Sequence, residues 1–299
     1  MTMLFHGLSA FPITPTDPEG RVDPDALGRL LEPLVETGVD SIGLLGSTGG
    51  YVYLTRAERR RAVEAAAEHV GGRVPLVVGV GALRTDEARA LAREAQAAGA
   101  QALLLAPVSY TPLTEEEVYQ HYRAVGGATD LPLCIYNNPG TTHFAFSDGL
   151  LARLAEIETI KAVKMPLPGT SSLEEELARL RPQLPADFAI GYSGDWGCAE
   201  ALLVGADAWH SVIGGLLPAP ALKLTRAAQA GEMAEVRRMD DAFQPLWSLF
   251  REFGSLRVVY TAVNLLALTD AVPPRPILPL SPGDQERVAA ALDVLRDLE

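Results

Sequence analysis

Lysine is almost absent from this sequence. Only three of its 25 basic residues are lysines, and two of them, Lys161 and Lys164, lie in one short apolar run, Thr159 to Pro166. Arginine stays protonated at ordinary pH, whereas burial can lower the pKa of a lysine from about 10.4 until the amine is neutral and nucleophilic. The run therefore predicts either a reactive lysine or lysines whose ammonium groups reach water from a strand end.

Cysteine is scarce as well, and the common metal-binding motifs are missing. Cys134 and Cys198 are isolated from each other and from any histidine spacing that would indicate zinc. We expect two buried, inert thiols, no disulfide framework and no metal cofactor. The sequence also lacks His-Glu-x-x-His and Gly-x-Ser-x-Gly motifs, so metal-assisted aldol chemistry and serine hydrolysis are without their usual residues.

Long apolar runs and an excess of positive charge are missing too. No run approaches the ~18 uncharged apolar residues of a membrane span, and residues 1–9 lack a signal-peptide pattern. The expected compartment is the cytoplasm. The net charge of -13 argues against a nucleic-acid partner, which needs a basic face. It does not exclude an anionic small molecule, because a pocket can be locally positive.

Eight short apolar runs alternate with longer amphipathic segments, at the ~30-residue spacing of strand–helix repeats. The predicted strands are Leu8–Ile13, Ser41–Gly46, Leu76–Gly81, Ala102–Pro107, Leu133–Asn137, Thr159–Met165, Phe188–Tyr192 and Ala208–Ile213. Eight apolar strands, each followed by a helix, are typical of an α/β protein with a (β/α)8 TIM barrel. The active site of such a barrel lies at the carboxyl ends of its strands.

The predicted helices begin at recognisable caps and continue beyond the barrel. Three starts fit a capping box, at Thr55 with Glu58, Thr114 with Glu117 and Ser172 with Glu175. The eight repeats are complete at about residue 230, so we expect residues 1–230 to form the catalytic barrel. Residues 231–299 carry helical patterns and no strand signal. We expect them to form a helical extension packed on the barrel rather than a separate domain.

Two predicted strand ends carry polar groups that would meet at the mouth of such a barrel. Strand two ends in Gly46-Ser47-Thr48-Gly49-Gly50, which can present hydroxyl and backbone N–H groups to a carboxylate or phosphate. Taken alone, an ordinary glycine-rich turn explains it equally well.

Strand five ends at Tyr136, whose phenol could accept and donate a proton there. A tyrosine can also finish a strand simply by keeping its hydroxyl in water.

The two lysines of strand six are separated by side-chain alternation. Ile160, Ala162 and Lys164 are predicted to share one face of the strand, and Lys161 the other. We expect Lys164 to point into the barrel and Lys161 to point outward into solvent. In strand eight, His210 is followed by two glycines; a single histidine in a strand is more often a core residue than a catalyst.

These motifs together resemble the dihydrodipicolinate synthase / N-acetylneuraminate lyase family of pyruvate-dependent class I aldolases. The resemblance runs from about Gly7 to the C-terminus. It rests on the turn at residues 46–49, on Tyr136-Asn137-x-Pro139 and on Lys164. It implies a Schiff base between Lys164 and pyruvate or another 2-oxo acid, and proton transfer by Tyr136. It further implies carboxylate binding by Ser47, Thr48 and nearby N–H groups, a homotetramer, and no metal.

Four positions depart from the pattern of that family. Gly50 stands where many members have glutamate. Many members also carry, after strand four, a tyrosine pair that completes a proton relay across a subunit interface, and the matching stretch here is Pro107-Val108-Ser109-Tyr110. The relay is therefore either shifted to Tyr110 or missing. Thr141 stands where the synthase has an arginine for the second substrate, and His210 where a small aliphatic residue borders the pyruvate site. Thr141, Tyr110 and His210 become candidate substrate-binding residues.

Three other interpretations remain open at this stage. The first is dihydrodipicolinate synthase activity itself, condensing pyruvate with aspartate semialdehyde. The second is a paralogue that binds a 2-oxo acid without turnover. The third is a phosphate-binding barrel that uses Gly214-Gly215, for which the preceding strand offers only the glycines between Gly191 and Gly194.

Overall fold

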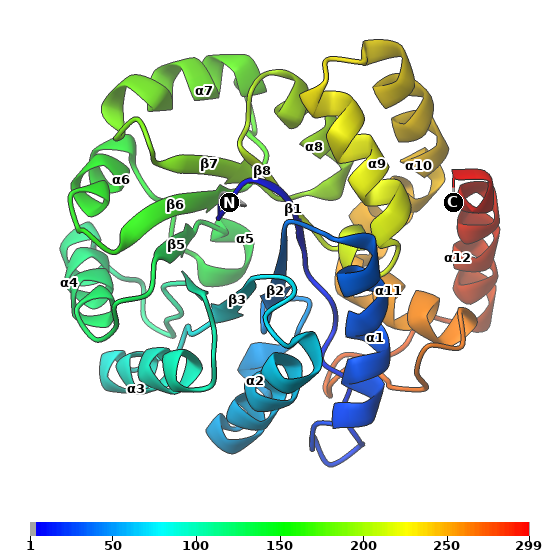
Figure 1. Ribbon diagram of the computed structural model, residues 1–299, viewed down its shortest axis with the longest axis horizontal. Helices are drawn as coiled ribbons and strands as arrows, with labels where there is room; N and C mark the ends of the chain where they lie inside the picture. Colours follow the sequence, from blue (N-terminus) through cyan, green and yellow to red (C-terminus); the bar gives the residue numbers. More distant parts are fainter. Residues whose placement is uncertain (1–3, 299) are drawn as a thin grey trace.

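The computed structural model describes residues 4–298, and its centre is a closed barrel of eight parallel strands. Neighbouring strands follow chain order, and β1 closes the barrel on β8. The strands are β1 (Gly7–Ala10), β2 (Ser41–Leu44), β3 (Leu76–Gly79), β4 (Ala102–Leu105), β5 (Leu133–Tyr136), β6 (Ile160–Met165), β7 (Ala189–Tyr192) and β8 (Ala208–Ser211). The predicted (β/α)8 architecture is confirmed (Figure 1).

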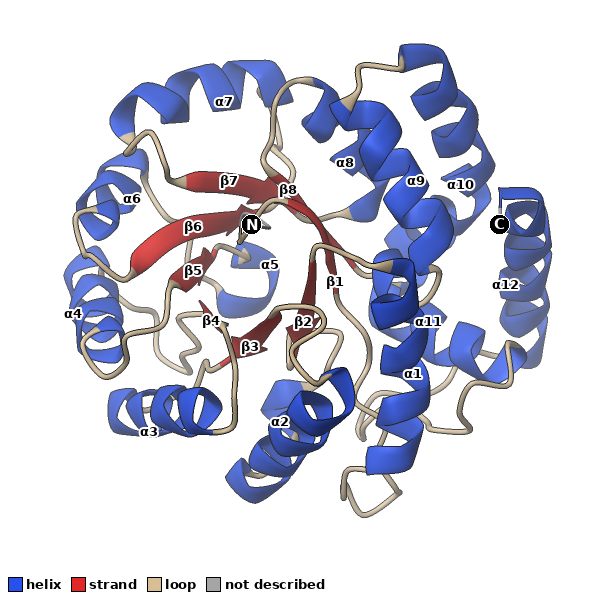
Figure 2. Ribbon diagram, viewed as in Figure 1, coloured by secondary structure: helices blue, strands red, loops and turns tan. Residues whose placement is uncertain are grey.

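Helices surround this barrel, as Figure 2 shows. The α-helices are α1 (Pro24–Thr37), α2 (Arg56–Val70), α3 (Thr85–Ala97), α4 (Glu115–Gly126), α5 (Pro139–Thr142), α6 (Asp148–Ala155), α7 (Leu173–Leu180), α8 (Asp195–Leu203), α9 (Pro218–Gln229), α10 (Met233–Phe253), α11 (Ser255–Leu265) and α12 (Pro282–Leu295). The short 3-10 helices are η1 (Tyr51–Tyr53), η2 (Arg181–Gln183), η3 (Ile213–Gly215) and η4 (Arg296–Leu298). After α9 the chain continues through α10, α11 and α12, and α10 packs against α8, α9 and α12.

Two of the three predicted capping boxes are complete. The hydroxyls of Thr114 and Ser172 each accept a hydrogen bond from the backbone N–H of the third helix residue, and their own backbone N–H groups donate to its carboxylate. At Thr55 only the hydroxyl caps the helix, because the Glu58 carboxylate accepts instead from the backbone N–H of Val22 at 2.7 Å. That carboxylate thus joins α2 to the segment before α1.

Most strands end two or three residues before the predicted limits, because the chain turns away at the barrel mouth. Strand β2 stops at Leu44, and the next residue, Leu45, has a φ of 56°. Leucine rarely adopts this left-handed conformation, so the backbone is strained where the strand gives way to the glycine-rich turn.

The pairing of β5 with β6 contains an irregularity that the alternation rule did not predict. Leu133 pairs with Ile160, but the next residue, Cys134, pairs with Ala162, so β6 carries one extra residue. Ile160 consequently packs in the outer core and Ala162 in the inner one. The prediction that Ile160 shares the inner face with Lys164 is therefore wrong, because a bulge shifts the alternation. The inward direction of Lys164 is unaffected.

The core has two parts, one between the strands and the helices and one inside the barrel. The inner cluster includes Phe5, Phe11, Leu104, Cys134 and Tyr136. Burial raises the pKa of the Cys134 thiol to about 12, and Cys198 is buried as well. The prediction that both thiols are buried is confirmed.

No helix within residues 4–298 is long and apolar enough to cross a membrane. In the same part of the chain, no three His, Cys, Asp or Glu side chains gather as metal ligands would.

Candidate active site

A cavity of about 770 Å³ opens at the carboxyl ends of the strands. It is bounded by the ends of the barrel strands, by η1, by α5 and by the starts of α8 and α11. Six of the predicted site residues line it: Ser47, Thr48, Tyr136, Thr141, Lys164 and His210. Residues from four strand ends thus meet in one place, as expected for this type of barrel.

Lys164 lies inside the barrel and Lys161 outside it, as the alternation predicted. The side chain of Lys164 is 4% exposed, and its amine lies 4.0 Å from the ring centroid of Phe11 and 4.4 Å from that of Tyr136. Lys161 is 44% exposed and pairs loosely with Asp187, at 3.8 Å. One lysine is therefore held between two aromatic faces in the cavity, and the other lies at the surface.

Phe11 reaches the position beneath Lys164 because two glycines leave room for its ring. A Cβ at Gly43 would lie 2.3 Å from the Phe11 ring, and one at Gly46 would lie 2.7 Å from it. A side chain at either position would clash with the ring and displace it. The glycines of β2 and its following turn thus shape the floor of the site.

The phenol of Tyr136 lies between two polar neighbours. Its hydroxyl is 3.0 Å from Ser47 Oγ, and the Asn138 amide donates to it, also at 3.0 Å. Burial raises the pKa of Tyr136, but the charge of Lys164 and these hydrogen bonds outweigh burial and leave the pKa below its ordinary value. A phenol with a lowered pKa, beside an amine, is suited to moving protons.

The glycine-rich turn after β2 presents its hydroxyl residues to the cavity. Ser47 and Thr48 line it, and Thr48 is 6% exposed. Gly49 does not line the cavity; a Cβ there would lie 3.0 Å from Leu45 Cα, so it allows the turn to fold closely on itself. Gly49 therefore allows the tight turn, while Ser47 and Thr48 face the cavity.

His210 is buried beside Lys164 and is 3% exposed. Its ring packs edge-on against Phe11, with centroids 5.8 Å apart, and its Nδ1 makes no hydrogen bond within residues 4–298. Burial, followed by the nearby charge of Lys164, lowers the pKa of His210 well below its ordinary value. The imidazole is therefore a neutral group with unused hydrogen-bonding capacity.

Tyr110 lies apart from the other predicted site residues. Its side chain is 97% exposed and does not line the cavity. Within a single chain it is thus not placed to contact a ligand at Lys164.

Asp195, which sequence patterns did not identify, lines the cavity at the start of α8 and is 2% exposed. Its carboxylate accepts hydrogen bonds from Ser211 Oγ at 2.7 Å and from the N–H groups of Val212 and Ile213. Burial raises its pKa although these bonds oppose the change. Asp195 fixes the turn after β8, and its position directly after strand seven could have identified it.

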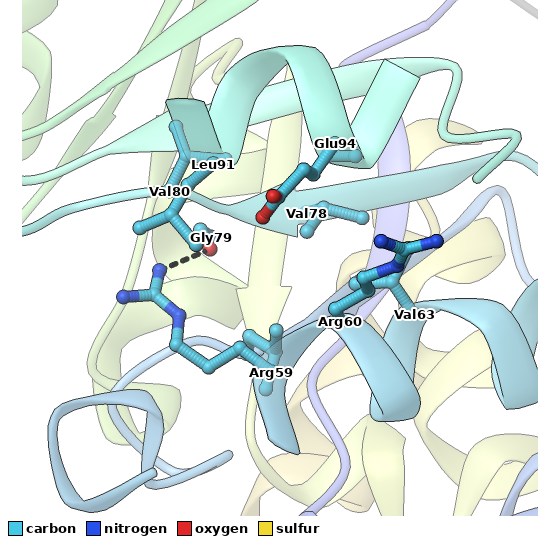
Figure 3. Close-up of a pocket in the computed structure, with 10 residues that line it drawn as sticks. Arg59, Arg60, Val63, Val78, Gly79, Val80, Leu91 and Glu94 are labelled. Carbon is cyan, nitrogen blue, oxygen red and sulfur yellow. Dashed lines mark hydrogen bonds between the residues drawn. The ribbon is translucent and has the colours of Figure 1, made fainter. Parts of the chain in front are cut away.

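A buried arginine on α2, Arg59, contacts the wall of the cavity. Arg59 is 6% exposed and donates to the carbonyl oxygens of Gly79 and Gly81, both at 2.9 Å, and Figure 3 shows it reaching from α2 to Gly79. Its Cζ also lies 5.2 Å from the ring centroid of Tyr51, which lines the cavity. Arg59 thereby ties α2 to the end of β3 and to the cavity wall.

A buried primary amine beside a phenol, at the strand ends of a (β/α)8 barrel, is the arrangement that Schiff-base chemistry requires. The fold and the site define a barrel enzyme, a lyase of the class I aldolase type. Residues 4–295 match the Dihydrodipicolinate synthetase family, and the chain belongs to this family.

Individual relatives agree with this assignment. The 4-hydroxy-tetrahydrodipicolinate synthase of Thiobacillus denitrificans is 37% identical over 285 residues, covering 94% of this chain and 93% of the relative. The crystal structure of a dihydrodipicolinate synthase from Agrobacterium tumefaciens has 63% identity and a TM-score of 0.97, covering 98% of this chain and 99% of its own. That of the chloride-inhibited enzyme from Acinetobacter baumannii, complexed with pyruvate, has 28% identity and a TM-score of 0.88, covering 97% and 98%.

Proposed function

We propose that Lys164 forms a Schiff base with the keto carbon of pyruvate or a related 2-oxo acid, and that the enzyme makes or breaks the carbon–carbon bond next to it. The observation that carries this proposal is the burial of the Lys164 amine between Phe11 and Tyr136 at the floor of the cavity. The pyruvate complex of the Acinetobacter relative supports the choice of ligand.

The turn after β2 is the proposed carboxylate site of the 2-oxo acid. Ser47 and Thr48 face the cavity, and Ser47 Oγ also reaches the Tyr136 hydroxyl. A carboxylate held here would leave the keto carbon near Lys164. His210, from the other side of the cavity, is proposed to hydrogen-bond the same ligand.

Tyr136 is the proposed proton carrier. Schiff-base formation requires a proton for the departing hydroxyl of the carbinolamine, and formation of the enamine removes one from the adjacent carbon. The lowered pKa of Tyr136 brings the phenol nearer to neutral pH, where a proton carrier works best. Ser47 and Asn138 hold the hydroxyl in place for these steps.

We also propose a cytoplasmic homotetramer. The exposure of Tyr110 and Leu83, at 97% and 66%, supports an interface between chains near the ends of β3 and β4. A tyrosine from a neighbouring copy could then act as the relay residue that the single chain lacks.

Borohydride reduction in the presence of pyruvate, followed by peptide mass analysis, tests the Schiff base. We expect a pyruvyl adduct on the peptide that contains Lys164. Lys164→Ala should abolish the adduct, and the matched variant Lys161→Ala should keep it. An unmodified Lys164 peptide in the native enzyme would refute the proposal.

A second candidate is 4-hydroxy-tetrahydrodipicolinate synthase activity, which the names of the relatives favour. It predicts turnover of aspartate semialdehyde with pyruvate in a coupled assay, although Thr141 offers no cation to the second substrate. The absence of product would remove this candidate. Turnover of any aldehyde with pyruvate would exclude a paralogue that only binds.

A further inference from the structure

The cavity lining contains few charged side chains, and each already has a role or a hydrogen-bond partner. Among the described residues that line it, Lys164 is the single lysine or arginine and Asp195 the single carboxylate. Asp195 accepts three hydrogen bonds from the β8 turn. If a 2-oxo acid forms the proposed Schiff base, its carboxylate balances the cationic nitrogen. Among these described lining residues, no charge then remains to pair with an ion on a second substrate, and an unpaired ion in such a site is costly.

One wall of the cavity is apolar where an anion site could otherwise exist. Leu167 lies against the first turn of α8, because a Cβ at Gly194 would be 3.1 Å and one at Gly197 2.6 Å from its side chain. Trp196 lies beside it, 3.5 Å from the same Gly194 position. Leu167 therefore packs over the start of α8, and Asp195 places a carboxyl group there, so an anion at this helix end would meet an apolar side chain and an acidic group.

The opposite rim is apolar and partly exposed. Val52 is 56% and Tyr53 42% exposed, and Trp196 across the cavity is 37% exposed, although all three line the same cavity. Leu256, at the start of α11, lines it as well. Large apolar side chains left exposed around one cavity mark a ligand-binding surface.

One cation near the cavity, Arg257, follows the lining residue Leu256 in the chain but does not line the cavity itself. A Cβ at Gly254 would be 3.9 Å from its Nη1, and this nitrogen donates to the Phe253 carbonyl oxygen at 3.1 Å. Its guanidinium therefore caps the end of α10 instead of facing the ligand space. Arg257 provides a test of the opposite view, that the site binds an anionic second substrate.

We infer that the second substrate is an uncharged aldehyde with an apolar substituent, seated against Leu167 and Trp196. This inference rests on the proposed Schiff-base function. The enamine carbon derived from pyruvate attacks the aldehyde carbon, a carbon–carbon bond forms, and the aldehyde oxygen takes up a proton. Water then hydrolyses the Schiff base, which frees Lys164 and releases a 4-hydroxy-2-oxo acid; no oxidant or reductant is needed.

The test is an aldehyde panel with pyruvate and the full-length enzyme, with the product measured by mass spectrometry. Isobutyraldehyde and benzaldehyde are expected to have kcat/KM values at least about tenfold above those of succinic semialdehyde, aspartate semialdehyde and glyceraldehyde. A preference for any of these charged or hydroxylated aldehydes overturns the inference, as does a pyruvate adduct without turnover of the apolar aldehydes. A missing adduct refutes the proposed function itself, and the inference with it.

Substitutions of residues that line the cavity test the same inference through their kinetic constants. Trp196→Ala should raise KM for isobutyraldehyde by about tenfold, and Thr141→Arg should raise kcat/KM for succinic semialdehyde by a similar factor. Val294→Ala is the matched control, because Val294 is an exposed apolar residue of α12 outside the cavity; it should change neither value. A loss of succinic semialdehyde turnover in Arg257→Ala would instead show that the site binds anions.

Discussion

The imidazole of His210 occupies the space that a side chain at Gly191 would need. A Cβ at Gly191 would lie 2.6 Å from His210 Nε2, and Gly191 itself pairs with Lys164 across the β6–β7 ladder. The missing side chain on β7 is therefore what allows a histidine of β8 to approach a lysine of β6. Three strands cooperate in this contact, and each contributes one residue.

Gly191→Ala should displace the imidazole and destabilise the fold by about 1–3 kcal/mol, as overpacked cores do. Urea unfolding measures the loss. In a His210→Ala background the same change should cost less, because most of the clash is removed, with Ala208 Cβ at 2.9 Å left as a neighbour. Equal costs in the two backgrounds would show that His210 is not the group displaced.

Tyr136→Phe should lower kcat by about 10²–10⁴, since it removes a proton carrier. Tyr192→Phe is the matched control, because its hydroxyl donates to Glu176 at 2.7 Å outside the cavity lining. The control should lose about 1 kcal/mol of unfolding free energy and keep its turnover. Steady-state kinetics with any accepted aldehyde separate the two variants, and a fully active Tyr136→Phe would contradict the role.

Arg59→Met should leave the carbonyls of Gly79 and Gly81 without their donor and cost about 2–4 kcal/mol. Arg56→Met, three residues earlier on α2, removes only an exposed pair with Glu94 and should cost about 0–1 kcal/mol. Denaturant titration compares them. Similar losses would mean that the buried contacts of Arg59 contribute little.

Acid should destabilise the protein through His121. Burial lowers the pKa of His121 to about 4, below the ordinary ~6.5 of an unfolded chain. The unfolded state therefore takes up a proton first as the pH falls. Unfolding free energy should drop between about pH 6.5 and pH 4, by about 3 kcal/mol in total.

His210 acts in the same direction, because its pKa is also lowered by burial. Urea unfolding at several pH values gives the slope. His121→Gln should make the slope shallower while leaving the hydrogen-bonding position beside Thr85 occupied. An unchanged slope in this variant would assign the acid sensitivity to other groups.

Much of the fold was readable from the sequence, because strands and helices leave local patterns. The helix start predicted at Thr55 is the N-terminus of α2, and the lysines of β6 separated as alternation required. The bulge opposite Leu133 was not readable. It depends on how two strands pair, and neither strand specifies that alone.

Part of the site could also be predicted from the sequence, because the ends of strands are marked by local patterns. Residues next to strand ends, such as Ser47 and Tyr136, could be placed at the mouth once a barrel was assumed. Asp195 and Trp196 were missed although they follow strand seven, because their helix start carries no distinctive motif. Tyr110 could be proposed as a candidate from its place after strand four, but its position relative to the cavity could not be predicted. The direction of a loop depends on tertiary contacts and not on sequence periodicity.

The sequence alone determined the barrel, which of the two β6 lysines faces into it, and which strands end in polar residues. Each of these follows from residue types at short, regular spacing. Only the tertiary structure decided that Phe11 lies under Lys164, that His210 fills the space above Gly191 and that Leu167 covers the start of α8. Each of these contacts joins residues from different strands or helices. Their geometry is fixed by close packing, which no single segment encodes.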